Sequence, residues 1–96
     1  MTRTIATFSG RVQNVGFRDA VQRIAARYDV AGTVRNVRDG ERLEIDVEGD
    51  DDDVRAFLDD VLEHPPRYAR VEHIDRRDAE PLGRHGFSVA PTTASP

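Results

Sequence analysis

The 96-residue chain has no cysteine and no tryptophan, and it contains no long apolar run. The absence of cysteine excludes disulfides, a thiolate nucleophile and every cysteine-based zinc site, so stability must come from packing. No segment approaches the ~20 apolar residues that cross a bilayer, and the first residues lack the charged-then-apolar order of a signal peptide. We therefore expect a soluble, cytoplasmic protein without a membrane partner.

Lysine is also absent, and the 14 residues counted as Lys or Arg are all arginine. Of the 18 acidic residues, 12 are aspartate. Arginine and short carboxylates keep a surface solvated where free water is scarce, so this composition favours a halophilic protein. A GC-rich genome, which favours arginine codons, would give the same bias, and the sequence does not separate the two explanations. The formal net charge of −4 opposes non-specific attraction to nucleic acid or to anionic membranes.

The length is typical of a single domain, and no linker rich in proline, glycine or serine divides the chain. We expect one domain over residues 1–90, with residues 91–96 as a disordered tail. A chain of this size buries roughly two-thirds of the surface that its unfolded form exposes, which leaves little room for an enclosed cofactor. We therefore expect a monomer without a cofactor whose functional surface lies at loops.

Hydrophobic periodicity predicts the element order β-α-β-β-α-β with a short terminal strand. Strands are predicted at residues 4–8, 31–37, 43–48, 69–75 and 87–89, and helices are predicted from about residue 17 and from residue 50 to 64. Residues 69–75 are the weakest strand, because Val71 and Ile74 do not share a face; a bulge or an edge position would explain this. The order favours the α+β class, as a ferredoxin-like α/β sandwich whose antiparallel sheet carries two helices on one face.

The clearest candidate for chemistry is the turn between the first strand and the first helix. Residues 9–18 read Ser-Gly-Arg-Val-Gln-Asn-Val-Gly-Phe-Arg, and their glycines permit a turn whose N–H groups point inward as an anion-binding nest. The helix N-terminus adds unpaired donors and a positive dipole end. Arg18 is unfavourable for that dipole, which suggests an oxyanion partner. From this pattern alone the signal is weak, and a functional interpretation is no better than a structural one.

Residues 10–18 resemble the signature of the acylphosphatase family, small enzymes with the predicted element order. A second block agrees: residues 32–36, which read Gly-Thr-Val-Arg-Asn, and the Asp-Gly pair at 39–40 are similar to the family's second strand and hairpin. Weaker agreement follows at residues 48–49, 65–66, 69–71 and 86–87. The resemblance spans roughly residues 5 to 90.

The resemblance implies metal-free hydrolysis of the carboxyl–phosphate bond of a small-molecule acyl phosphate. Arg18 would bind the phosphoryl group and Asn36 would position the attacking water. The backbone N–H groups that would hold the phosphoryl oxygens are those of Arg11, Val12, Gln13, Asn14, Val15 and Gly16. These are suitable tools, because phosphoryl transfer demands charge stabilisation and in-line alignment more than covalent chemistry. Asn36 could also simply end a strand before a turn.

Asn14 departs from the family, which usually has glycine at this position. If the backbone there needs a positive φ, asparagine is the best substitute, at a cost of order 1 kcal/mol. The departure leaves open a non-catalytic module that binds phosphate or carbamoyl-type ligands, or contacts a partner. An RNA-binding module on the same fold is disfavoured, because the chain is acidic and Phe8 and Phe87 are its only strand aromatics.

Other polar groups are weaker candidates. His64, His73 and His85 fall on different elements without metal-site spacing, so we expect no metal. The four aspartates at 50–53 suit a solvated helix start better than a cation site. Asp19 is expected to complement the helix dipole rather than to act as a base.

Overall fold

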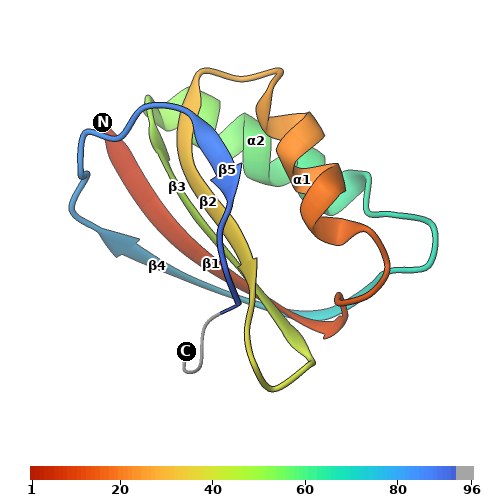
Figure 1. The fold of residues 1–96 in the computed structure, drawn as a ribbon. Helices are drawn as coiled ribbons and strands as arrows, with labels where there is room; N and C mark the ends of the chain where they lie inside the picture. The colour runs from red at the N-terminus through yellow and green to blue at the C-terminus, as the bar shows by residue number, and fades with distance from the viewer. Residues whose placement is uncertain (93–96) are drawn as a thin grey trace.

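The computed structural model of the protein describes residues 1–92. Its elements follow the order β1 (Thr2–Arg11), α1 (Phe17–Ala25), β2 (Val30–Asn36), β3 (Arg42–Gly49), α2 (Asp51–Glu63), β4 (Arg70–Ala79) and β5 (Phe87–Val89). The strands form one sheet in the order β4-β1-β3-β2-β5. Both helices cover the same face of that sheet (Figure 1), which confirms the ferredoxin-like α+β arrangement. Of the predicted tail, residues 93–96 lie outside the described part.

Strand β4, which the sequence predicts only weakly, has both a bulge and an edge position. It lies at the edge of the sheet beside β1. The pairing also shifts register: Ser9 faces His73 and Gly10 faces Val71, so Glu72 is an extra residue in β4. This bulge brings Val71 and Ile74, which are three residues apart, onto the same face, where both pack against the core. It therefore explains the broken alternation.

Two features differ from the prediction. The antiparallel arrangement holds for β1 to β4, but β5 pairs in parallel with β2, so the sheet is mixed. The first strand also continues past Gly10 as far as Arg11. Gly10 does not end the strand; it allows β4 to come close, because a Cβ there would lie 2.3 Å from the carbonyl oxygen of Arg70.

The core lies between the sheet and the helices. Leu43, Ile45 and Val47, which alternate with acidic residues along β3, are fully buried on this side. The Phe8 ring on β1 meets the Phe17 ring at the start of α1 edge to face, with centroids 5.9 Å apart. This contact fixes the N-terminus of α1 against the strand that leads into it.

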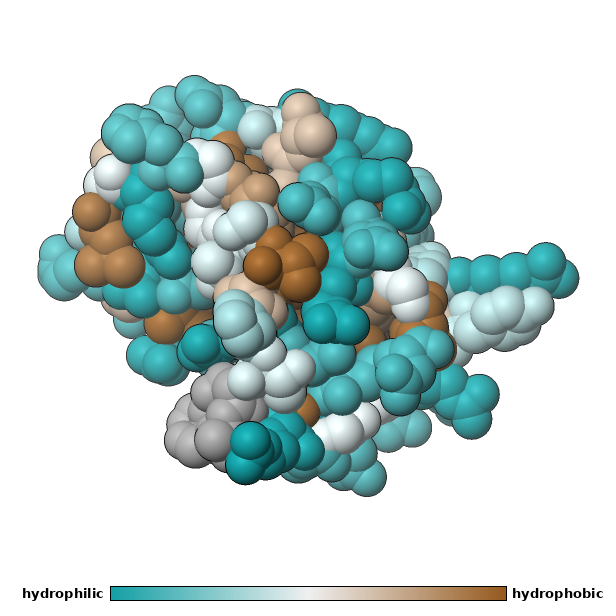
Figure 2. Space-filling model, viewed as in Figure 1, coloured by the Kyte–Doolittle hydropathy of each residue, from teal (hydrophilic) through white to brown (hydrophobic). Residues whose placement is uncertain are grey.

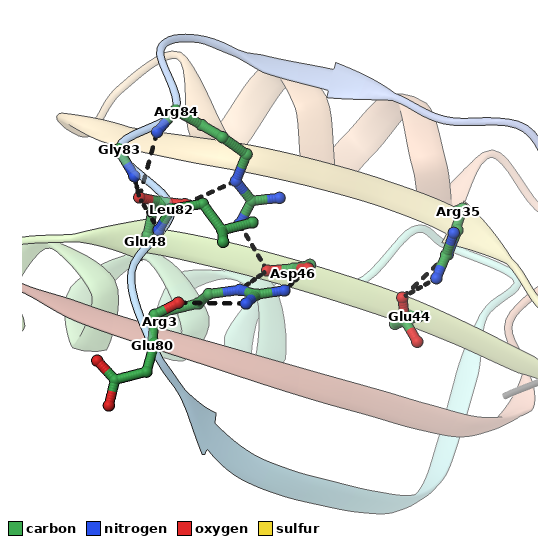
Figure 3. Close-up of polar contacts among 9 residues, drawn as sticks. All are labelled: Arg3, Arg35, Glu44, Asp46, Glu48, Glu80, Leu82, Gly83 and Arg84. Carbon is green, nitrogen blue, oxygen red and sulfur yellow. Dashed lines mark hydrogen bonds and ion pairs between the residues drawn. The ribbon is translucent and has the colours of Figure 1, made fainter.

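The opposite face of the sheet is polar, and it carries ion pairs centred on the carboxylates of β3 (Figure 3). The segment of residues 80–86, which we call the strap, joins β4 at one edge to β5 at the other. Glu48 of β3 is 1% exposed, and it accepts backbone N–H bonds from Leu82, Gly83 and Arg84 of the strap at 3.0, 2.7 and 3.3 Å. The Glu48 carboxylate therefore anchors the middle of the strap, while Arg3 donates to Glu80 O at 3.2 Å and Gly32 N to Gly86 O at 2.9 Å at its two ends.

The surface seen in Figure 2 is mostly hydrophilic, with hydrophobic residues scattered across it. The large exposed hydrophobic residues of the described part are Met1, Tyr68, Leu82 and Val89. None of the helices formed by residues 1–92 has the length and apolar character needed to cross a membrane.

Candidate functional site

The turn that the sequence singled out forms a loop of residues 12–16 between β1 and α1, which we call the cradle loop. Asn14 has φ 60° and Gly16 has φ 78°, both in the left-handed region. Within residues 1–92, Asn14 is the one residue other than glycine with a positive φ. The position therefore requires the backbone conformation for which asparagine is the best substitute for glycine. Left-handed residues in such a turn direct successive N–H groups inward.

Helix α1 begins without a side-chain cap. Its N-cap is Gly16, which has no side chain to offer, and the first backbone hydrogen bond of the helix runs from Ala20 N to Gly16 O at 3.1 Å. The N–H groups of Phe17, Arg18 and Asp19 come before that bond and have no partner within the helix. The start of α1 thus offers free donors and the positive end of the helix dipole to an anion.

The residues that carry these donors line a small pocket of about 70 Å³. Its walls come from the cradle loop, the first turn of α1 and the end of β2: Val12, Asn14, Gly16, Phe17, Arg18, Asp19 and Asn36. The structure therefore brings Arg18 and Asn36 together with part of the cradle loop. Arg11, Gln13 and Val15 are not part of its walls. Their roles toward a phosphoryl group stay predictions.

The three predicted residues outside the walls have other surroundings. Arg11 is the last residue of β1 and faces Arg70 of β4. Val15 is partly buried and packs against the core. The side chain of Gln13 reaches the β2–β3 hairpin, where its Nε2 donates to the carbonyl oxygens of Val37 and Arg42.

Two pocket residues, Phe17 and Asp19, were not predicted as site residues. The sequence did contain a signal for these two residues. They follow the loop directly, and the first turn of a helix has N–H groups without partners inside the helix. Asp19 is exposed and brings a carboxylate to the pocket wall. Arg18 is half-buried, and it takes part in none of the ion pairs among residues 1–92. Its guanidinium is therefore free to bind an anion.

Asn36 is the last residue of β2 and is only 7% exposed. Its Oδ1 atom is buried, and no donor of the described residues lies within hydrogen-bond distance of it. A buried polar atom without a partner costs roughly 1–3 kcal/mol. A donor that enters the adjoining pocket would recover that energy, so the carboxamide is suited to hold a small polar molecule.

Larger hollows lie elsewhere on the surface. Two grooves of about 450 Å³ each run along β1, the hairpin and β4, and a third of about 270 Å³ lies beside the strap. Their walls carry acidic and basic side chains together, and neither the cradle loop's left-handed residues nor the start of α1 contributes to them. In the described part of the chain, no three His, Cys, Asp or Glu side chains are grouped to hold a metal ion. The small pocket is therefore the best candidate, although it is not the largest hollow.

Comparison with known proteins identifies similar chains. The family model described as Acylphosphatase matches residues 5–89. A curated acylphosphatase of Lactiplantibacillus plantarum is 40% identical over 81 residues, which are 84% of this chain and 89% of the relative. One of Thermus thermophilus is 38% identical over 89 residues, or 93% and 99% of the two chains. The crystal structure of acylphosphatase from Bacillus subtilis superposes with a TM-score of 0.87 and 34% identity, covering 94% of this chain and 99% of that one.

Proposed function

The chain belongs to the acylphosphatase family, and we propose that its cradle loop, Arg18 and Asn36 carry out the family reaction. The reaction itself is hydrolysis of the carboxyl–phosphate bond of an acyl phosphate, which releases a carboxylate and orthophosphate. The convergence of three elements on one pocket supports this assignment of residues: the left-handed cradle loop, the uncapped start of α1 and the end of β2.

The phosphoryl group binds to the backbone and to Arg18. Its equatorial oxygens accept hydrogen bonds from the cradle loop and from the first N–H groups of α1, where the helix dipole favours negative charge. The planar guanidinium of Arg18 matches two phosphoryl oxygens at once. The backbone donors are fixed by the fold before the reaction begins, so they stabilise the charge of the transition state without reorganisation.

The size of the pocket limits what it recognises. A water molecule occupies ~30 Å³ in the liquid, so a pocket of about 70 Å³ accepts little more than a phosphoryl group. The acyl group must then lie outside it. We infer that the enzyme selects its substrates by the phosphoryl end and tolerates different acyl groups.

Asn36 positions the attacking water. A water held by the Asn36 carboxamide attacks phosphorus in line with the bond to the acyl oxygen. The new P–O bond forms as the bond to the carboxylate breaks, and the carboxylate leaves with the bonding electrons. The water's proton passes to a phosphoryl oxygen of the substrate. A carboxylate is a good leaving group, so no strong general base is needed.

Hydrolysis of benzoyl phosphate in metal-free buffer tests the assignment. We expect Arg18→Ala and Asn36→Ala each to lower kcat/KM by about 10²- to 10³-fold, the usual effect of removing one preorganised group, while circular dichroism shows a folded protein. Arg23→Ala, a change of an exposed arginine on the same helix, is the control and should stay near wild type. Wild-type turnover in the Arg18 variant would reject the assignment.

The argument for a non-catalytic module was that Asn14 replaces the usual glycine. The backbone at this position weakens that argument. Asn14 adopts the left-handed conformation with φ 60° that glycine would otherwise supply, so the departure leaves the backbone of the cradle loop in its nest-like form. Orthophosphate that shifted the amide resonances of residues 12–18 in a chain without turnover would revive this alternative.

We further propose that the enzyme works in the cytoplasm as a salt-adapted monomer that binds neither nucleic acid nor membranes. The net charge of −4 and the use of arginine in place of lysine support this proposal. Light scattering during gel filtration tests the oligomeric state. A melting temperature that does not change with molar KCl would contradict salt adaptation.

A further inference from the structure

We propose that Gln13 is a positioning residue for this reaction, whose side-chain amide fixes the place of Asn36 relative to the cradle loop. The inference rests on the proposed role of Asn36. It concerns the side chain of Gln13, which points away from the pocket walls, and not the backbone N–H that the family resemblance assigned to phosphate.

Gln13 holds two carbonyl oxygens with one nitrogen. Its Nε2 donates to Val37 O at 2.6 Å and to Arg42 O at 2.8 Å. An amide nitrogen has two hydrogens, so both of its donors are in use. Val37 directly follows Asn36 in the chain. The contact therefore reaches the backbone one residue away from the side chain that positions water.

The strand order of the sheet explains why this contact matters for the site. In the order β4-β1-β3-β2-β5, strand β3 separates β1 from β2. The cradle loop follows β1 and Asn36 ends β2, so no backbone ladder joins the two halves of the site directly. Among the hydrogen bonds within residues 1–92, the two from Gln13 join the cradle loop to the β2–β3 hairpin.

Gln13 also binds the hairpin at its turn, between the end of β2 and the start of β3. Arg42 O accepts a backbone bond from Val37 N at 3.0 Å as well as the bond from Gln13. The Gln13 side chain thus donates hydrogen bonds to both sides of the hairpin, next to the cradle loop. Because both arms are held, the cradle loop and the end of β2 move as one unit.

This arrangement separates binding from rate. Phosphate affinity depends on the cradle loop, the start of α1 and Arg18, whereas the rate also depends on where Asn36 holds the water. A displacement of ~1 Å in reacting groups costs up to ~100-fold in rate. Loss of the Gln13 side-chain bonds should therefore lower kcat and leave the affinity for orthophosphate nearly unchanged.

The test replaces Gln13 by methionine, which keeps an unbranched side chain of similar length and removes both donors. The chain has one other glutamine, Gln22, which is exposed on α1, so Gln22→Met is the matched control. With benzoyl phosphate, we expect Gln13→Met to lower kcat by about 10- to 100-fold. The inhibition constant of orthophosphate should change less than about twofold, and Gln22→Met should change neither quantity.

A double-mutant cycle identifies the route of the effect. In the Asn36→Ala background, Gln13→Met should change kcat by less than about twofold, because the group that it positions is gone. An equal loss of kcat in both backgrounds would overturn the inference. If Asn36→Ala alone left kcat unchanged, the assignment of Asn36 under the proposed function would fail instead, so the two failures are distinct.

A spectroscopic measurement covers the case in which Gln13→Met folds poorly. The chain has two asparagines and two glutamines, so its side-chain amide region in a ¹H–¹⁵N spectrum is simple to assign. Gln13→Glu keeps the shape of the side chain but replaces the donor nitrogen by an acceptor oxygen, which cannot bind the two carbonyl oxygens. We expect it to shift the Asn36 amide pair and leave the Gln22 pair in place. An Asn36 pair that stays unshifted would overturn the inference, as would an orthophosphate inhibition constant that rises in step with the loss of kcat.

Discussion

Arg84 of the strap donates from Nε to the Glu48 carboxylate of β3 at 2.6 Å, and the same guanidinium reaches Asp46 at 2.6 Å (Figure 3). Burial acts to raise the pKa of Glu48, but the hydrogen bonds from Arg84 and from the N–H of Gly83 outweigh it, so this pKa lies below its usual value. The pKa of Asp46 is also lowered, because the hydrogen bonds from Arg3 and Arg84 outweigh the effect of burial.

The strap should therefore make the fold sensitive to acid. Because the folded-state pKa of Glu48 lies below the unfolded value of about 4.3, the carboxylate contributes fully above that value. Its contribution is lost as the pH falls through the lower folded-state pKa. At pH 7 we expect Glu48→Gln to lower the free energy of unfolding by about 2 to 4 kcal/mol, as measured by urea titration.

The difference between Glu48→Gln and wild type should shrink as the pH falls below about 4. Glu63→Gln, at an exposed position near the end of α2, is the control and should leave the pH dependence of stability unchanged. A gap that stayed constant down to pH 2 would show that the Glu48 charge does not hold the strap.

The left-handed backbone at Asn14 predicts an unusual order of stability. Alanine pays about 1 kcal/mol or more in this conformation, whereas glycine pays no steric cost. Asn14→Gly should therefore be more stable than Asn14→Ala by about 1 kcal/mol in urea unfolding. At Gln22, in the interior of α1, the order should reverse, because glycine destabilises a helix by about 0.5–1 kcal/mol relative to alanine. The same order at both positions would contradict the φ of 60° at Asn14.

Asp19 brings a carboxylate to the wall of the pocket that we propose to bind the phosphoryl group. Asp19→Asn should lower the inhibition constant of orthophosphate about two- to fivefold at low salt, because an exposed charge pair is worth up to about 1 kcal/mol. The gain should shrink in molar KCl, where the screening length is about 3 Å. Asp78→Asn is the control, because Asp78 pairs with Thr4, far along β1 from the cradle loop.

The same Asp19 variant also tests the mechanism. We expect its kcat to stay within about twofold of wild type. A general base typically contributes 10²- to 10⁴-fold, so a loss of kcat of that size would assign Asp19 that role and would contradict proton transfer to the substrate.

Arg18→Lys separates charge from geometry. Lysine keeps the positive charge but loses the planar pair of donors that matches two phosphoryl oxygens. We expect kcat/KM to fall by about 10-fold or more, yet less than in Arg18→Ala. Arg23→Lys is the matched control. Equal losses for lysine and alanine at position 18 would mean that the charge alone contributes nothing.

The sequence predicted the order of elements well, because local periodicity determines each one. Alternation in β3 and the three- and four-residue spacing in α1 do not depend on distant contacts. It failed where distant contacts decide. Gly10 reads as the end of a strand, but the Arg70 carbonyl that approaches it belongs to β4. The parallel pairing of β5 likewise depends on the path of the strap across the sheet.

The candidate site divides in the same way. A turn with free donors could be recognised from residues 9–18, because glycines and a helix start are local signals. That Asn36 belongs to the same site came from the family resemblance and not from spacing, since β3 lies between the two strands. The two carbonyls that receive the Gln13 amide lie across the fold, so no local pattern could reveal them.

The pairing of β1 with β4 joins segments that lie more than half the chain apart, and this has a consequence for folding kinetics. Non-local strand pairing requires the closure of a long loop, and the entropy lost in this step is offset only after the strands have met. Such pairing therefore makes folding slow. The bulged end of that pair, beside Arg11, leads directly into the cradle loop. The anion site should therefore form late in folding, so orthophosphate should slow unfolding and leave the refolding rate unchanged.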